Sequence, residues 1–304
     1  MPRTIWQALT SNPRVGVFIL AVPGLAYFLL FKYLPLLGNI IAFKNYDLFL
    51  GIWGSPWVGF SQFERMFRYG EFIQIVTNTF AISFYQLIFG FPAPLILALL
   101  LNEIRTFWFK RFTQTMLYLP HFLSWIIVGG IFIELLSTKG MVNLMRASLF
   151  GAGPVQYLIE PDYFRGILVS IGIWKEVGWG MIIYLAALAG INPSLYEAAV
   201  VDGANRWRQM WSITLPALLP AIVILFLLRV GNLLDQNVEQ VLVFLNPLVR
   251  NVGEVIDTYV YRVGLQGAQY SYTTAIGILK SLVGLVMVVS LNQLSKKVTG
   301  ESMY

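Results

Sequence analysis

The chain has 304 residues, of which 57% are hydrophobic and only 12% are charged, against roughly 25% charged in an ordinary soluble domain. It contains no cysteine, which excludes disulfides, thiolate catalysis and cysteine-based metal sites. The formal charge of +6 comes from scattered lysines and arginines rather than from a basic stripe. The composition therefore favours a membrane protein with basic cytosolic loops and argues against nucleic acid as a partner.

Apolar stretches long enough to cross a bilayer, about 20 residues each, recur along the whole chain. They predict an all-α integral membrane protein with six transmembrane helices, at residues 15–37, 73–101, 117–136, 163–188, 215–238 and 273–294. The first stretch is too long for a signal-peptide core, and a long amphiphilic loop follows it. With an even number of spans, both termini are expected on the same side of the membrane.

The lysines and arginines of the loops predict which side that is. The denser set comprises Arg3, Arg14, Arg105, Lys110, Arg111, Arg206, Arg208, Lys296 and Lys297, and the sparser set comprises Lys44, Arg65, Arg68, Lys139, Arg146, Arg250 and Arg262. Because loops rich in these residues stay in the cytoplasm, both termini and residues 192–216 are predicted to be cytoplasmic.

Residues 192–216, between the fourth and fifth spans, predict a short helix, a sharp turn and a second helix. Asn192 suits the N-cap and Pro193 the first helical position, where its missing N–H costs nothing. Asp202 and Gly203 are expected to end this helix, since glycine accepts the left-handed conformation of a sharp turn. Ala198 and Ala199 give the first helix a surface of small side chains that another protein can approach closely. An amphipathic hairpin lying on the membrane surface is the alternative, although such a hairpin needs no glycine at a fixed distance.

The same segment resembles the cytoplasmic Glu-Ala-Ala (EAA) coupling-helix loop of binding-protein-dependent ABC importer permeases. The matching residues, at the family's spacing, are Glu197, Ala198, Ala199, Gly203, Ile213, Leu215 and Pro216. YLPHFLSWIIVGGIF at 118–132 and VIDTYVYRVGL at 255–265 look similar to the sugar-importer branch, which includes permeases for maltose and glycerol phosphate, and especially to permeases for alginate or aldouronate oligosaccharides. The resemblance extends over most of the chain and implies a type I ABC importer permease fold.

The resemblance also implies a domain organisation and a set of partners. Residues 1–72 would form a cytoplasmic tail, the first span and an external loop, residues 73–295 the permease core, and residues 296–304 a cytoplasmic tail. In a bacterial inner membrane, the chain would pair with a second permease, two cytoplasmic ATPase subunits and a periplasmic or lipoprotein solute-binding protein. Glu197 would pair with a basic residue of an ATPase, and Asp202 would lie in the coupling turn. The expected cargo is an oligosaccharide, and more narrowly an acidic one such as an alginate or other uronate fragment.

No cofactor is expected in this chain, and it is not expected to be an enzyme. It contains no G-x-x-x-x-G-K-[ST] phosphate-binding loop, so ATP and Mg²⁺ are expected to bind to the partner ATPase subunits. Its single histidine, His121, has no carboxylate nearby in sequence, and structural packing is the favoured interpretation for it.

Charged residues within the spans are expected to be functional, because a charge in hydrocarbon is costly. Three cations and one anion suggest a basic path for an anionic sugar, with polar neighbours that supply hydrogen bonds; the candidates are Lys175, Glu176, Tyr184, Arg229, Asn232, Gln236 and Lys280. Because neighbours in sequence point in different directions on a helix, Lys175 and Glu176 are not expected to face one path together. The alternative is that these charges pair with one another or with the second permease.

Three other functions remain as alternatives at this point. An ion-coupled secondary sugar transporter would show broken helices in two related halves and no docking loop. An ABC permease for a non-sugar solute would share the coupling loop. A membrane-embedded enzyme would need clustered histidines and carboxylates at membrane depth.

Overall fold

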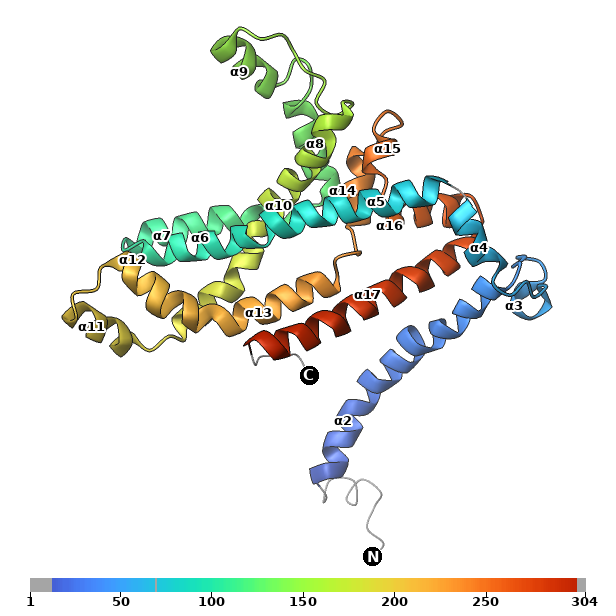
Figure 1. The fold of residues 1–304 in the computed structure, drawn as a ribbon, viewed down its shortest axis with the longest axis horizontal. Helices are drawn as coiled ribbons and strands as arrows, with labels where there is room; N and C mark the ends of the chain where they lie inside the picture. The colour runs from blue at the N-terminus through green and yellow to red at the C-terminus, as the bar shows by residue number, and fades with distance from the viewer. Residues whose placement is uncertain (1–12, 69, 300–304) are drawn as a thin grey trace, which may run out of the picture. The chain divides into compact units, whose positions relative to one another are not determined.

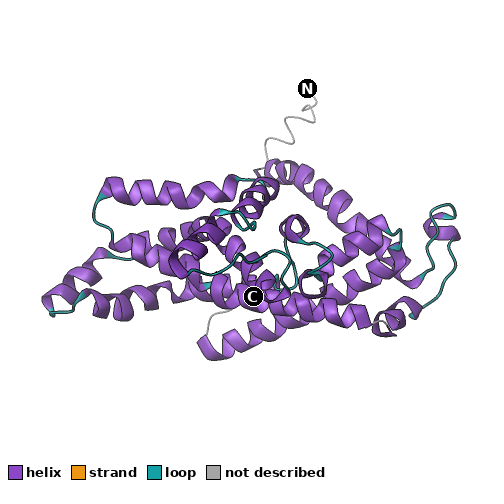
Figure 2. Ribbon diagram, turned by 90° about the horizontal axis from the view of Figure 1, so that it is seen from above, coloured by secondary structure: helices purple, strands orange, loops and turns teal. Residues whose placement is uncertain are grey.

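The computed structural model describes residues 13–68 and 70–299, which fold into helices joined by short loops (Figure 1). The predicted N-terminal tail up to residue 12, with Arg3, and residues 300–304 of the predicted C-terminal tail lie outside the described residues. The chain divides into two compact units, Met1–Arg68 with Val263–Ile278, and Tyr69–Arg262 with Leu279–Tyr304. Figure 2 shows how completely the described part of the chain is helical.

The first unit contains a long apolar helix and the loop that follows it. Its elements are α2 (Pro13–Phe28), a π-helical turn (Leu29–Tyr33), a 3₁₀ segment (Leu34–Phe43), α3 (Gly51–Gly54), α4 (Ser61–Arg68), and the first turns of α17 (Tyr270–Thr299). Lys44 is buried and holds the loop closed, because its Nζ donates to the carbonyl oxygens of Ile52 at 2.7 Å and Ser55 at 3.3 Å.

The second unit carries the sites described below. Its elements are α5 (Gly70–Tyr85), α6 (Pro92–Glu103), α7 (Phe107–Tyr118), α8 (Trp125–Leu135), α9 (Met141–Phe150), α10 (Pro161–Ala189), α11 (Pro193–Val201), α12 (Arg206–Gln209), α13 (Leu215–Gly231), α14 (Val238–Phe244), α15 (Arg250–Gly253), α16 (Ile256–Tyr259) and the remainder of α17. The helix α10 packs against α6, α7, α13 and α14 and so forms the centre of this unit.

Two apolar clusters surround α10. One joins Trp125 of α8, Phe164 and Leu168 of α10, and Phe244 of α14. The other joins Ala98 of α6, Met181 and Tyr184 of α10, and Leu218 of α13. Since the two clusters hold α10 at both of its ends, the side chains between them are placed at a fixed position among α5, α6, α8, α13 and α14.

An ion-paired cluster ties α5 to the segment around α15 and α16. The guanidinium of Arg262 donates to Glu254 at 2.7 Å and to Glu71 at 2.8 Å. The hydrogen bond to Glu254 raises the pKa of Arg262 above its ordinary value, against the smaller opposing effect of burial. The guanidinium of Arg262 is therefore charged at neutral pH.

Five of the predicted spans are confirmed as helices long and apolar enough to cross a membrane. Within the described residues they run Gly16–Phe43, Gly70–Glu103, Pro161–Ala189, Arg206–Gly231 and Tyr270–Gln293. The bounds of the fifth predicted span, 215–238, were wrong at both ends. The helix begins at Arg206, and it ends at Gly231 because residues 232–237 form an irregular connection to α14.

The third predicted span, at 117–136, is not a single helix. Phe107–Phe122 and Trp125–Leu135 are two helices bent by 103° at a short break. Pro120 lies in the last 3₁₀ turn of the first helix and cannot donate a backbone hydrogen bond. Ser124 then adopts an extended conformation, and its hydroxyl accepts from the N–H of Ile127, so that α8 starts with a new N-cap.

Three prolines in the other spans follow π-helical turns, whereas Pro23 and Pro220 lie within α-helical stretches. Such turns occupy Leu29–Tyr33, Gln86–Gly90 and Met210–Thr214, and Pro35, Pro92 and Pro216 each follow within two residues. A proline clashes with the preceding helical turn and lacks an N–H, and a widened turn relieves both problems. The helices therefore remain continuous through these prolines, and within residues 13–68 and 70–299 the third span is the one bent sharply at a break.

Candidate functional site: a helical elbow and a polar cavity

The helical elbow, residues 192–216, begins as the sequence predicts. The side chain of Asn192 accepts from the N–H of Ser194 at 3.0 Å, and Pro193 occupies the first turn of α11. The helix ends at Val201, and Gly203 adopts a left-handed conformation with φ of +74°. Both expectations for the ends of this helix are confirmed.

The turn after α11 is closed by two backbone hydrogen bonds. The N–H of Gly203 donates to Val200 O at 3.0 Å, and the N–H of Ala204 donates to Ala199 O at 2.8 Å. This pair of bonds is the Schellman motif, which leaves little freedom at the end of a helix. Asn205 then caps α12 by accepting from the N–H of Arg208 at 2.9 Å. The elbow is therefore a defined turn rather than a loose loop.

The residues of the predicted coupling motif are distributed between the surface and the base of the elbow. Glu197, Ala198 and Asp202 are exposed, whereas Ile213 and Leu215 are half-buried where the elbow joins α13. Trp207 and Trp211 expose more than half of their surface. The elbow thus presents a carboxylate, small side chains and two indoles on its outside.

A groove of about 650 Å³ separates the elbow from the connection between α6 and α7. It is lined by Asn102, Glu103 and Arg105 on one side and by residues of the elbow, among them Tyr196, Val200 and Arg206, on the other. Arg206 bridges the two sides by an ion pair to Glu103 at 2.5 Å. In Figure 1 the elbow and the α6–α7 connection lie at the same end of the second unit.

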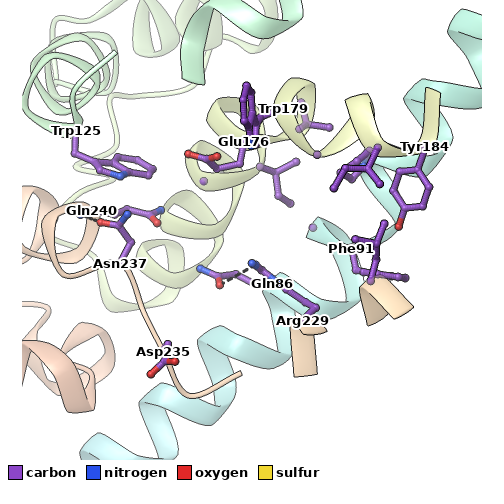
Figure 3. Close-up of a pocket in the computed structure, with 18 residues that line it drawn as sticks. Gln86, Phe91, Trp125, Glu176, Trp179, Tyr184, Arg229, Asp235, Asn237 and Gln240 are labelled. Carbon is purple, nitrogen blue, oxygen red and sulfur yellow. Dashed lines mark hydrogen bonds between the residues drawn. The ribbon is translucent and has the colours of Figure 1, made fainter. Parts of the chain in front are cut away.

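The polar cavity, about 490 Å³ in volume, lies among α6, α8, α10, α13, α14 and the π-helical turn that follows α5 (Figure 3). Its aromatic walls come from Phe91, Trp125, Trp179 and Tyr184. Three amide side chains reach it, from Gln86, Asn237 and Gln240, together with the charged groups of Glu176, Arg229 and Asp235. A cavity with aromatic walls and a few polar groups is the usual form of a small-molecule site.

The structure brings three of the predicted path residues to this cavity and leaves four outside its lining. Glu176, Tyr184 and Arg229 line it, whereas Lys175, Asn232, Gln236 and Lys280 do not. The buried amide of Gln236 donates to Ser83 Oγ at 2.7 Å, and Asn232 donates to the Leu228 carbonyl at 3.1 Å. These two side chains hold the chain after α13 in place rather than facing the cavity.

The structure shows where the cations of the predicted basic path lie. Lys175 is buried and its Nζ donates to the His121 carbonyl at 2.8 Å and contacts Glu176 Oε1 at 3.3 Å. Lys280 lies between Asp257 Oδ1 at 2.5 Å and Asp235 Oδ1 at 2.6 Å. Both lysines are thus engaged by carboxylates and neither of them lines the cavity, so Arg229 is the one cation among its described lining residues.

His121 has a carboxylate partner that its sequence neighbourhood does not reveal. Its Nδ1 lies 2.8 Å from Glu176 Oε2, and its ring stacks on Trp179 with centroids 4.5 Å apart. No group of three or more His, Cys, Asp or Glu side chains suited to a metal exists among the described residues. The contacts of His121 join the bend of the third span to α10, which supports the packing interpretation.

Sequence reasoning missed several residues that line the cavity. Gln86, Trp125, Asn237 and Gln240 come from three different segments, and none is charged. A sequence signal existed for Asn237, which precedes a short apolar helix and caps it by accepting from the Gln240 N–H at 3.0 Å. Gln86 and Trp125 had no such signal, because apolar runs surround them.

A bundle of membrane-length helices with an internal polar cavity and an exposed helical elbow defines a polytopic membrane transport protein. The chain belongs to the family of binding-protein-dependent transport system inner membrane components, whose model matches residues 90–300. It is therefore a membrane component of a transport system.

Its relatives agree with this assignment. Protein LplB of Bacillus subtilis (strain 168) is 46% identical over 300 residues, covering 98% of this chain and 94% of LplB. The polygalacturonan/rhamnogalacturonan transport system permease protein YteP of the same organism is 45% identical over 288 residues, covering 95% and 90%. A chain in the crystal structure of a bacterial alginate ABC transporter, in complex with an alginate pentasaccharide-bound periplasmic protein, is 38% identical with a TM-score of 0.88, covering 98% of this chain and 99% of that one. The predicted importer permease fold is confirmed.

Proposed function

We propose that this chain is the transmembrane permease subunit of an ATP-driven importer and that residues 192–216 receive force from an ATPase. The observation that carries the proposal is the closed turn at Gly203, which makes the exposed α11 a stiff projection. A conformational change in a partner reaches the spans only through a rigid contact. Glu197, Ala198, Ala199, Asp202 and Gly203 would meet the ATPase, and Ile213, Leu215 and Pro216 would join the elbow to the fifth span.

The nucleotide chemistry belongs to partners in this proposal. The sequence has no phosphate-binding loop of the G-x-x-x-x-G-K-[ST] form. Two cytoplasmic ATPase subunits would bind ATP and Mg²⁺, and this chain would pair with a second, similar permease. Both termini and the elbow would then face the cytoplasm of a bacterial cell.

The proposed cargo is an oligosaccharide delivered by an external solute-binding protein. The cavity supports this choice, because aromatic faces and amide groups, such as those of Trp179 and Gln86, are suited to the apolar faces and hydroxyls of sugar rings. The relatives support it as well, since YteP is a permease for polygalacturonan and rhamnogalacturonan and the solved transporter is one for alginate.

The experiment that tests the proposal is uptake into proteoliposomes that contain the complete transporter. Glu197→Lys should abolish sugar-stimulated ATP hydrolysis and uptake while the subunit still inserts. Glu64→Lys is the matched charge reversal, because Glu64 is also exposed but forms only a surface pair with Arg68; it should leave both activities in place. Normal uptake by the Glu197→Lys variant, or uptake driven by an ion gradient without ATP, would contradict the proposal.

A further inference from the structure

The charged groups that line the polar cavity differ in how far the protein itself neutralises them. They are the carboxylates of Glu176 and Asp235 and the guanidinium of Arg229. A charge at membrane depth is costly unless it is paired or faces a polar cavity. The pairing of each group therefore indicates which of them is available to a ligand.

Glu176 is already engaged on both of its oxygens. Oε2 lies 2.8 Å from His121 Nδ1, and Oε1 lies 3.3 Å from Lys175 Nζ. Lys175 is buried and fixed by its bond to the His121 carbonyl. Because these partners come from the protein, the carboxylate of Glu176 contributes little net charge to the cavity.

Asp235 is engaged through one of its two oxygens. Its Oδ1 lies 2.6 Å from Lys280 Nζ, which also contacts Asp257 Oδ1 at 2.5 Å. The lysine that balances Asp235 does not line the cavity. Because Asp235 shares this lysine with Asp257, its carboxylate is paired with a cation of the protein but only partly neutralised.

Arg229 has no carboxylate within ion-pair distance among the described residues, and Glu176 attracts it only from farther away. Its Nη2 donates to the neutral amide oxygen of Gln86 at 3.4 Å, and it forms no ion pair within residues 13–68 and 70–299. Figure 3 shows the two side chains meeting within the cavity, Arg229 from α13 and Gln86 from the π-helical turn after α5. A guanidinium has five N–H donors in a planar fork, and a long bond to an amide leaves most of them unused.

We propose, building on the importer function proposed above, that Arg229 selects carboxylated sugars by binding a uronate carboxylate of the cargo. The planar guanidinium matches a carboxylate through two parallel N–H···O bonds, which a neutral hydroxymethyl group cannot reproduce. Trp179 and Phe91 line the same cavity and offer faces for the sugar ring. Gln86 is a positioning residue in this arrangement, because its amide holds the guanidinium without neutralising it.

The test compares two sugars that differ only in the carboxylate. Trigalacturonate and its carboxyl-reduced counterpart, galactotriose, are each offered to proteoliposomes that hold the complete transporter and its solute-binding protein, with ATP inside. Wild-type protein should import the acidic sugar faster, and Arg229→Gln should lower its import about tenfold or more while galactotriose import changes less than twofold. Arg229→Lys should retain part of the preference, since lysine keeps the charge but loses the planar fork.

A second variant tests the same idea with the guanidinium still present. Gln86→Glu is nearly isosteric and places a carboxylate beside Arg229, so the cargo's carboxylate should be excluded and acidic import should fall as in Arg229→Gln. Lys139→Gln is the matched control, because Lys139 is exposed and lies outside the cavity lining. This variant should import both sugars at the wild-type rate.

The outcomes separate this inference from the function on which it rests. Equal losses for both sugars in Arg229→Gln would overturn it and assign Arg229 to pairing with another subunit. Faster import of galactotriose than of trigalacturonate by wild-type protein would overturn it while the importer function stands. Import of neither sugar, with ATP hydrolysis that no sugar stimulates, would overturn both.

Discussion

Lys280 of α17 forms an ion pair with Asp235, which lies in the irregular connection between α13 and α14, at 2.6 Å. The same Nζ contacts Asp257 of α16 at 2.5 Å, and Asp257 Oδ2 accepts from the backbone N–H of Gln236 at 2.9 Å. One lysine thus joins three segments of the second unit. Because the connection after Gly231 has only a few turn hydrogen bonds, such as that from Asp235 N–H to Asn232 O at 3.0 Å, these contacts help to fix its path.

Replacing Lys280 should therefore loosen this connection rather than change which sugar is carried. Lys280→Met leaves two carboxylates facing each other, and we expect it to lower the free energy of unfolding by roughly 2 kcal/mol. This loss is smaller than the loss on breaking a fully buried ion pair, because Asp235 is largely exposed. Import of acidic and neutral trisaccharides should fall in parallel. Thermal unfolding of the purified complex and uptake of both sugars provide the measurements.

The double variant Lys280→Met/Asp257→Asn is the internal control for that prediction. It removes one of the two carboxylates left without a cation, so it should recover part of the lost thermal stability. A double variant that is less stable than Lys280→Met would show that the ion pairs do not hold the connection.

The sequence predicted the elbow in detail because its determinants are local. A cap at Asn192, a proline in the first turn and a glycine at the turn act within a few residues of one another, and each was found where the sequence placed it. Hydropathy similarly located the spans, since a membrane-length apolar run has few other structures open to it.

The cavity was predicted only in part, because its charges are paired over long distances in sequence. Glu176 meets His121, and Lys280 meets Asp235, through packing of separate helices. Counting the cations in the spans predicted a basic path. In the structure, Lys175 and Lys280 are paired with carboxylates and do not line the cavity. The break of the third span was missed for a related reason: Pro120 alone does not decide between a kink, a π-helical turn and a new N-cap, as the continuous helices at Pro92 and Pro216 demonstrate.

Gly178 should be required for the contact between α10 and α7. A Cβ at this position would overlap the carbonyl oxygen of Leu117, which is backbone and cannot rotate away. We expect Gly178→Ala to lower the melting temperature of the purified complex by several degrees and to reduce uptake. Gly166→Ala, on the same helix with no atom within 4 Å of the new Cβ, should be neutral or slightly stabilising, because alanine favours a helix by about 1 kcal/mol over glycine. Similar melting temperatures for the two variants would refute the close packing at Gly178.

The proposed orientation of the chain in the membrane can be tested with single cysteine substitutions, since the sequence contains no cysteine. Ser194→Cys lies at the exposed start of α11, and Ser148→Cys lies on exposed α9 between the third and fourth spans. In intact cells, a membrane-impermeant maleimide should label Ser148→Cys and should label Ser194→Cys only after the membrane is opened. The reverse pattern would place the elbow outside the cell and contradict its role in coupling to an ATPase.

Glycine should be required at position 203 because of its left-handed backbone conformation. A side chain there would not be too large for the space around it. The φ of Gly203 is +74°, and a Cβ added there would have no atom within 4 Å. A β-branched residue resists the left-handed region, so Gly203→Val should shift the turn at a cost of about 1–2 kcal/mol and open the Schellman motif. Gly203→Asn is the matched control, because asparagine adopts this conformation far more readily while adding a side chain of similar size.

We expect the valine variant to lose sugar-stimulated ATP hydrolysis, with basal hydrolysis unchanged, and the asparagine variant to retain most of it. Equal loss in both variants would mean that the side chain itself blocks a partner at this surface, whereas activity of the valine variant would show that the turn need not be rigid.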